Sequence, residues 1–197
     1  MKTQTSRRQN GFTLVELLVV IAIIAVLAGA GFAAGSAAIQ KAKKTTALAS
    51  CTSIESAVNN FYTDYGSMPK DAMMNDTKVD SKDKPFLNAL LGLETGTTIM
   101  NTRGVKYLSV REGKAKTGGG TNGLVYTGST IVGIFDPWGG AFSVMLDGDY
   151  DEKITVQTAA GTQKTLNGRR SAAWSNGADA VSGTGGRASD DVITWNP

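Results

Sequence analysis

The sequence predicts an α+β fold in which one long N-terminal helix leads into a domain of short β-strands. Two observations predict it. Residues 17–40 carry no charge and continue into a segment with helical periodicity. Most of the 24 glycines lie in the second half of the chain, between short runs of β-branched and polar residues. This spacing is typical of strands joined by tight turns.

The composition argues against several classes of function. The 197 residues, 41% of them hydrophobic, suffice for one compact domain with additional segments. There is no histidine, and Cys51 is the only cysteine. An imidazole base, a Cys/His nucleophile pair and a Cys/His zinc site are therefore excluded, and an enzyme is not expected. A single thiol also cannot form an internal disulfide.

The formal net charge of +3 does not indicate nucleic-acid binding. Lys2, Arg7 and Arg8 lie within the first eleven residues, which contain no acid, and the remaining chain has 17 basic and 17 acidic side chains. A balanced chain has no electrostatic reason to seek phosphate.

The uncharged run from Leu17 to Gln40 predicts a membrane span. Its 24 residues would reach about 36 Å as a helix, and a bilayer core is about 30 Å thick. The run is too long for a secretory signal peptide. The basic residues ahead of it predict a cytoplasmic N-terminus. A plain anchor does not explain Glu16 at the start of the span, because a carboxylate at mid-membrane costs about 2.5–3.5 kcal/mol.

The residues "GFTLVELL", which begin at Gly11, resemble the prepilin signature of type IV pilins and type II secretion pseudopilins. In that family a membrane peptidase cuts after the glycine and methylates the new terminus. The resemblance implies cleavage between Gly11 and Phe12, with N-methylation of Phe12. The new cation lies four residues before Glu16. Between staggered subunits the same two charges can fix axial register, since an unpaired charge is penalised in a low-dielectric bundle. Glu16 is therefore the expected assembly residue.

An apolar stripe follows the span. It recurs at intervals of three and four and comprises Leu48, Cys51, Ile54, Val58, Phe61 or Tyr62, and Tyr65. We expect one helix from about Thr13 to Tyr65, with its outer half on the core. Gly66 fits a left-handed cap and Pro69 blocks continuation. A thiol on the stripe is expected to be buried and inert.

Residues 67–84 are expected to be irregular, before a short helix with Pro85 in its first turn and Gly92 at its end. The segment "KTGGGTNG", residues 116–123, is expected to be a loop. Strands are predicted to begin at Val105, Leu124, Thr130, Ala141, Lys153 and Arg170.

Three further segments resemble the major pseudopilins: "FYTDYGSMP" from Phe61, "DPWGGAFSV" from Asp136 and "WSNGADAVSGTGGRASDDVITW" from Trp174. The resemblance implies a pilin-like fold, in which the long helix packs against a small antiparallel sheet. It divides the chain into a cleaved leader (1–11), the membrane and filament-core half of the helix (12–40), its amphipathic half (41–66) and a periplasmic α+β domain (67–197).

One acidic group lies in "DGDYDEK", where Asp147, Asp149 and Asp151 alternate like the start of an EF-hand loop. The sixth position is Glu152, where that loop needs glycine. The twelfth is Thr158, where it needs a bidentate acid. A solvated hairpin turn is predicted instead.

A second acidic group lies in the C-terminal loop. Major pseudopilins bind calcium there, and the resemblance implies Asp179 with Asp190 or Asp191 as ligands, Ca²⁺ being the one expected cofactor. The alternative is a loop without metal, closed by Trp174 and Trp195 packing against the sheet.

The leading functional hypothesis is a non-enzymatic subunit of a type II secretion pseudopilus that supports protein export. Its expected partners are copies of itself, the prepilin peptidase, the inner-membrane assembly platform, minor pseudopilins and the lipid bilayer. The expected location is the bacterial inner membrane, with the globular domain in the periplasm, and then the filament. A type IV pilus pilin, used for adhesion, motility or DNA uptake, is the first alternative, although many such pilins carry a C-terminal disulfide. A membrane-tethered binding module is the second.

Overall fold

The computed structural model describes residues 12–70, 73–157, 163–181 and 191–195. The chain divides into two compact units, residues 1–41 and 42–197. Helix α1 (Leu14–Tyr65) contributes residues to both units. The second unit holds helix α2 (Lys84–Leu91) and the ten strands found among the described residues. The fold is α+β, a long N-terminal helix with small antiparallel sheets, as the sequence predicts.

Helix α1 has the predicted bounds, with 52 residues that end at Tyr65. Gly66 adopts a left-handed conformation with φ of 67°. Its backbone N–H donates to the carbonyl oxygen of Tyr62 at 2.7 Å, so the predicted cap is confirmed.

The apolar stripe of α1 forms the centre of the core of the second unit. Its fully buried side chains are Ala47, Cys51, Ile54, Ala57, Val58 and Phe61. The prediction that Leu48 lies on this stripe was wrong. Its side chain is 43% exposed, because Ala47, and not Leu48, lies on the same buried face of the helix as Cys51. Cys51 is buried as predicted, and burial raises the pKa of its thiol, which keeps it protonated.

Helix α2 (Lys84–Leu91) confirms the short helix predicted from Pro85 and Gly92. The Asp83 carboxylate caps its start by accepting the Phe86 N–H at 3.1 Å. Gly92 ends it in a left-handed conformation with φ of 66°. A Cβ at this glycine would lie 2.6 Å from the backbone of Gly104, so a larger residue does not fit.

The main sheet has four antiparallel strands in the order β1-β6-β9-β10. These are β1 (Thr77–Asp80), β6 (Ser143–Leu146), β9 (Ser171–Ser175) and β10 (Val192–Ile193). Side chains alternate between its faces. Val144 and Ala173 belong to the core that contains α1, whereas Trp174 belongs to a second apolar cluster.

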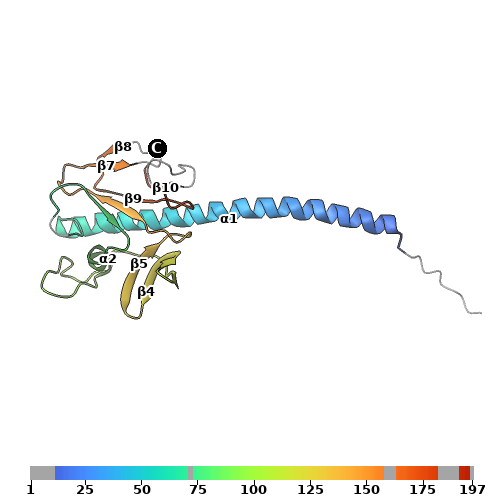
Figure 1. Ribbon diagram of the computed structural model, residues 1–197. Helices are drawn as coiled ribbons and strands as arrows, with labels where there is room; N and C mark the ends of the chain where they lie inside the picture. Colours follow the sequence, from blue (N-terminus) through green and yellow to red (C-terminus); the bar gives the residue numbers. More distant parts are fainter. Residues whose placement is uncertain (1–11, 71–72, 158–162, 182–190, 196–197) are drawn as a thin grey trace, which may run out of the picture. The chain divides into compact units, whose positions relative to one another are not determined.

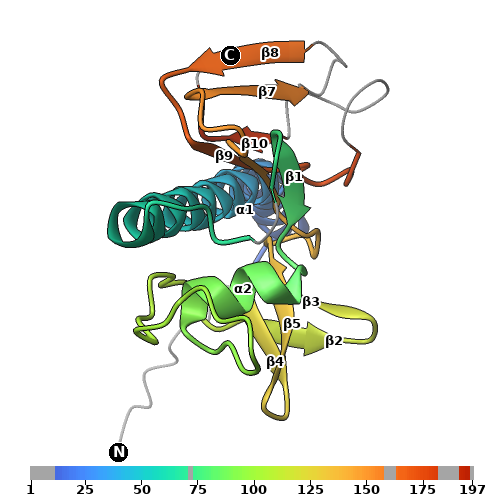
Figure 2. The same cartoon turned by 90° about the vertical axis from the view of Figure 1, so that its left-hand side faces the viewer.

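This second cluster lies between the main sheet and a two-stranded ribbon, β7 (Lys153–Gln157) and β8 (Gln163–Asn167). Two other hairpins complete the unit: β2 (Lys114–Lys116) with β3 (Gly119–Thr121), and β4 (Gly123–Thr127) with β5 (Thr130–Phe135). Within the second unit, β9 and the ribbon lie on one side of α1, and α2 and the β4–β5 hairpin lie on the other (Figures 1 and 2).

Three secondary-structure predictions were wrong. Residues 67–84 are not wholly irregular, because they contain β1. The glycine-rich segment is not a plain loop, since it contains β3. No strand begins at Val105. There the N–H groups of Tyr107 and Leu108 donate to the carbonyl oxygen of Leu90, at the C-terminal end of α2. These N–H groups therefore form hydrogen bonds with a helix and not with a neighbouring strand. β8 and β10 were also not anticipated.

Candidate functional site

The N-terminus of α1 is capped by reciprocal hydrogen bonds between Thr13 and Glu16. The backbone N–H and the hydroxyl of Thr13 both donate to Glu16 Oε2, at 2.9 and 2.7 Å. The Glu16 N–H donates to Thr13 Oγ1 at 3.2 Å. This is a capping box, which satisfies backbone donors at a helix N-terminus. Its Thr-x-x-Glu signature is visible in the sequence at Thr13 and Glu16.

The expected pairing of Glu16 with the amine of Phe12 stays a prediction. Phe12 is described and its side chain is 76% exposed. Gly11, on the other side of the expected cut, lies outside the described residues. The cap shows that the Glu16 carboxylate has a local partner in the single chain, so a role in assembly must be separated experimentally from a role in capping.

The first half of α1 presents a continuous apolar surface. An 18-residue window reaches a mean hydropathy of 2.8, none of it buried, so the helix is long and apolar enough to cross a membrane. The exposed large side chains are Phe12, Leu14, Val15, Leu17, Leu18, Val19, Val20, Ile21, Ile23, Ile24, Val26, Leu27, Phe32 and Ile39. An apolar surface of this extent requires lipid or other helices as partners.

A half-buried carboxylate, Glu55, fixes α1 to the main sheet. Its Oε1 accepts the N–H of Ala173 at 2.8 Å and the hydroxyl of Thr194. Arg169 Nη1 lies 3.7 Å from its Oε2. Burial raises the pKa of Glu55, and the bonds from Thr194 and Ala173 and the charge of Arg169 offset part of this effect. In the sequence Glu55 was only a polar residue between stripe positions.

The raised pKa of Glu55 gives a testable pH dependence. A carboxyl with a folded pKa above its unfolded value of 4.5 stabilises the fold fully below that value, and this contribution is lost as pH rises through the folded pKa. Glu55→Gln removes the titration and keeps an acceptor oxygen. Urea unfolding of the full chain in detergent should show wild type losing stability relative to Glu55→Gln as pH rises from about 4.5 to 7.5. Parallel stability profiles would contradict the assignment.

Asp136, in the "DPWGG" segment, organises the turn between β5 and β6. Its Oδ1 accepts the N–H groups of Trp138, Gly139 and Gly140 at 2.9, 2.8 and 2.8 Å. Its Oδ2 accepts the hydroxyl of Ser175, in β9, at 2.6 Å. The carboxylate is 1% exposed, so it is a structural acceptor that ties the turn to the main sheet.

The predicted calcium ligands of the C-terminal loop are described only in part. Asp179 is half-buried and its Oδ1 accepts the Val181 N–H at 3.0 Å. Asp191 is half-buried beside β10, and Asp190 lies outside the described residues. Calcium at this loop therefore stays a prediction. Trp174 and Trp195 are buried and pack edge to face with ring centroids 5.6 Å apart, as the alternative expects.

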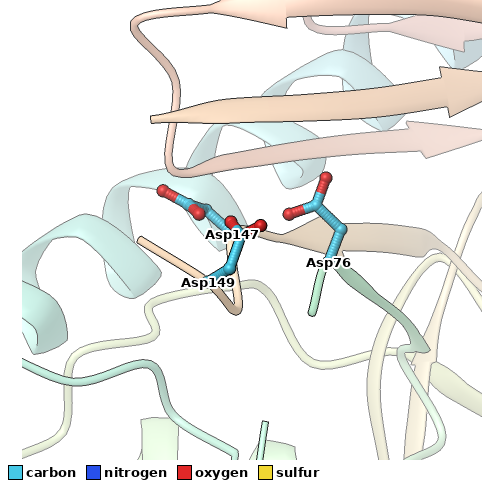
Figure 3. A group of neighbouring side chains, drawn as sticks. All are labelled: Asp76, Asp147 and Asp149. Atoms are coloured by element: carbon cyan, nitrogen blue, oxygen red, sulfur yellow. The ribbon is translucent and has the colours of Figure 1, made fainter. Parts of the chain in front are cut away.

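The "DGDYDEK" segment is not a solvated hairpin turn, so that prediction was wrong. β6 pairs with β1 and β9, while β7 pairs with β8, and the turn between β6 and β7 thus joins two different sheets. Asp147 is fully buried. Asp76 approaches Asp147 and Asp149 from the other side (Figure 3). Sequence reasoning missed Asp76 because it lies far from the turn along the chain.

A membrane-type helix capped by an acid at its head, and packed on small antiparallel sheets, defines the class of filament subunits anchored by an N-terminal helix. A model of the prokaryotic N-terminal methylation motif matches residues 6–32. The chain is 30% identical over 105 residues to the fimbrial protein EcpC of Eikenella corrodens, covering 53% of this chain and 68% of that protein. The chain belongs to the type IV pilin family, whose members are structural subunits.

A second relative is the type IV major pilin protein PilE of Neisseria gonorrhoeae. It is 38% identical over 63 residues, which is 32% of this chain. The chain spans only 38% of the length of this pilin. No solved structure matches the chain.

Proposed function

We propose that this protein is the structural subunit of a type II secretion pseudopilus. It is cut after Gly11, N-methylated at Phe12, and polymerised through α1 to support protein export. The observation that carries the proposal is the exposed apolar half of α1 with Glu16 at its head. Such a surface is compatible with storage in a bilayer and with burial among other copies of the helix.

We infer the orientation of the chain in the membrane from the positions of its charged residues. Lys2, Arg7 and Arg8 precede the span, and basic residues favour the cytoplasmic side. The second unit then faces the periplasm, and the proposed partners are further copies of this chain, the prepilin peptidase, the assembly platform and minor pseudopilins. Glu16, at the start of the span, supports further copies of this chain as partners, because a neighbouring chain can supply the positive charge that its carboxylate needs.

A type IV pilus pilin is the second candidate, and the names of the two relatives favour it. The pseudopilus is supported by the resemblance of the Asp136 and Trp174 segments and by the single, buried Cys51, which allows no internal disulfide. Deleting the gene in the native host separates them. Loss of exported proteins from the medium with intact surface pili would support the pseudopilus, and loss of surface pili with normal export would support the pilus.

Processing is tested by mass spectrometry of the protein from its native host. We expect the mature chain to begin at Phe12 and to carry one methyl group on its amine. A host without the prepilin peptidase should yield the chain with Met1 to Gly11 attached and unmethylated. Wild-type material that retains this leader in assembled filaments would refute the proposed function.

A further inference from the structure

Three carboxylates meet where β1 begins and β6 ends. Thr77 and Leu146 are the terminal pair of the β1–β6 ladder, so Asp76 and Asp147 occupy the next positions of the two strands. Asp149 follows two residues later in the turn. One oxygen from each of Asp76, Asp147 and Asp149 lies within 4.8 Å of the others (Figure 3). The antiparallel register therefore brings together acids that are distant in the sequence.

Backbone contacts hold these side chains in place. A Cβ at Gly148 would lie 2.0 Å from the carbonyl oxygen of Asn75, which shows how closely the two segments approach. Asp147 Oδ2 accepts the Glu152 N–H at 3.0 Å. Asp76 Oδ2 accepts the Thr155 N–H at 3.3 Å. One oxygen of each of these two carboxylates is thus fixed by a backbone donor.

The backbone N–H groups of Gly148 and Tyr150 lie near Asp76 and Asp147 and lower their pKa values, but the second oxygen of each carboxylate has no hydrogen bond of standard geometry within the described residues. Asp147 is 0% exposed, and within the described part of the chain its Oδ1 has no hydrogen-bond partner. The same holds for Asp76 Oδ1, which is also shielded from solvent. A carboxylate oxygen can only accept, and leaving a buried acceptor unsatisfied is unfavourable. Two such atoms in one acidic group are therefore available as acceptors for a positively charged ligand.

Neighbouring cations do not neutralise this group. Among the ion pairs of the described residues, Lys153 pairs with Asp151 at 3.1 Å and Arg170 pairs with Glu152. Asp76, Asp147 and Asp149 take part in none of these pairs.

The electrostatics agree with this geometry. Burial raises the pKa of Asp147, and its contact with Asp149 and the charge of Asp76 add to the effect. Burial also raises the pKa of Asp76, with contributions from the charges of Asp149 and Asp151. A bound cation would lower the pKa values of both carboxyls, because it compensates the desolvated charge and screens the repulsion between the acids.

We propose that Asp76, Asp147 and Asp149 form a calcium site. With calcium–oxygen distances of about 2.3–2.6 Å, two oxygens on opposite sides of one ion lie up to about 5 Å apart, and three evenly spaced oxygens lie up to about 4.5 Å apart. The three oxygens here lie within 4.8 Å of one another, so at most a small shift of the side chains lets them bind one ion. Calcium accepts six to eight oxygen ligands, including water, and exposed Asp149 leaves an entry from solvent. Magnesium is less suited because it needs near-ideal octahedral geometry and retains most of its water. The ion would join the chain entering β1 to the β6–β7 turn.

This site is separate from the C-terminal loop and does not depend on the proposed function. It is tested by calorimetric titration of CaCl₂ into the full chain, purified in detergent and freed of metal with a chelator. Melting with CaCl₂ and with chelator is measured in parallel. We expect wild type to bind calcium at this site and to melt about 5 °C or more higher at saturation. Asp149→Asn should weaken binding at least about tenfold, and Asp147→Asn should abolish it.

Two controls locate the ion. Asp151→Asn changes an acid of the same turn that is already paired with Lys153, and Asp179→Asn changes the C-terminal loop. Asp179→Asn should leave calcium binding at the proposed site unchanged, and Asp151→Asn should weaken it far less than Asp149→Asn does. The melting temperatures in chelator show whether each variant folds, and Asp149→Asn, at an exposed position, is the variant least prone to unfold. Wild-type binding retained in Asp149→Asn and Asp147→Asn, no calcium binding at all, or equally tight magnesium binding would overturn the proposal.

Discussion

Filament assembly is expected to fall at least about 100-fold when Glu16 is replaced by alanine. Glu16→Ala would leave the new amine of Phe12 without its acid inside a bundle of apolar helices. Removing one partner of a buried ion pair costs about 3–5 kcal/mol, and each 1.4 kcal/mol is about a tenfold change in an equilibrium. The measurement is the amount of filament sheared from cells, compared with the membrane pool of processed subunit.

The capping box makes two further variants informative. Glu16→Gln keeps an acceptor for the Thr13 N–H and hydroxyl but removes the charge, and glutamine serves a capping box as well as glutamate does. Thr13→Ala weakens the cap and keeps the charge. If pairing between subunits is the role of Glu16, Glu16→Gln fails to assemble and Thr13→Ala assembles. The reverse result would show that Glu16 acts only as a helix cap.

Replacing Asp136 by alanine should destabilise the second unit by at least about 3 kcal/mol. Four donors lose their acceptor: three backbone N–H groups of the turn and the Ser175 hydroxyl. Each buried donor left unsatisfied costs about 1–3 kcal/mol, partly recovered where water enters. Urea unfolding of the full chain in detergent, followed by tryptophan fluorescence, measures the loss.

Asp136→Asn is the matched control for this prediction. Its amide oxygen can accept the same three N–H groups, and its NH₂ can donate to the Ser175 hydroxyl oxygen. We therefore expect Asp136→Asn to retain most of the stability that Asp136→Ala loses. Equal stability of wild type and Asp136→Ala would show that the turn between β5 and β6 holds without this carboxylate.

The sequence determined the elements that depend on neighbouring residues. The helix from about Thr13 to Tyr65, its left-handed end at Gly66, and α2 between Pro85 and Gly92 follow from hydrophobic period and end signals within one turn. The segment around Gly11, which carries the family resemblance, is equally local. Such features need no knowledge of distant partners, and this is why they could be recognised.

The tertiary structure alone decided which distant residues meet. β1 and β3 lack a strong strand pattern and exist because β6 and β2 supply their hydrogen-bond partners. Glu55 becomes a half-buried contact only when α1 lies against β9. Asp76 joins Asp147 because the β1–β6 register places them opposite each other. Strand pairing joins residues far apart in the chain, so its partners and register cannot be read from local periodicity.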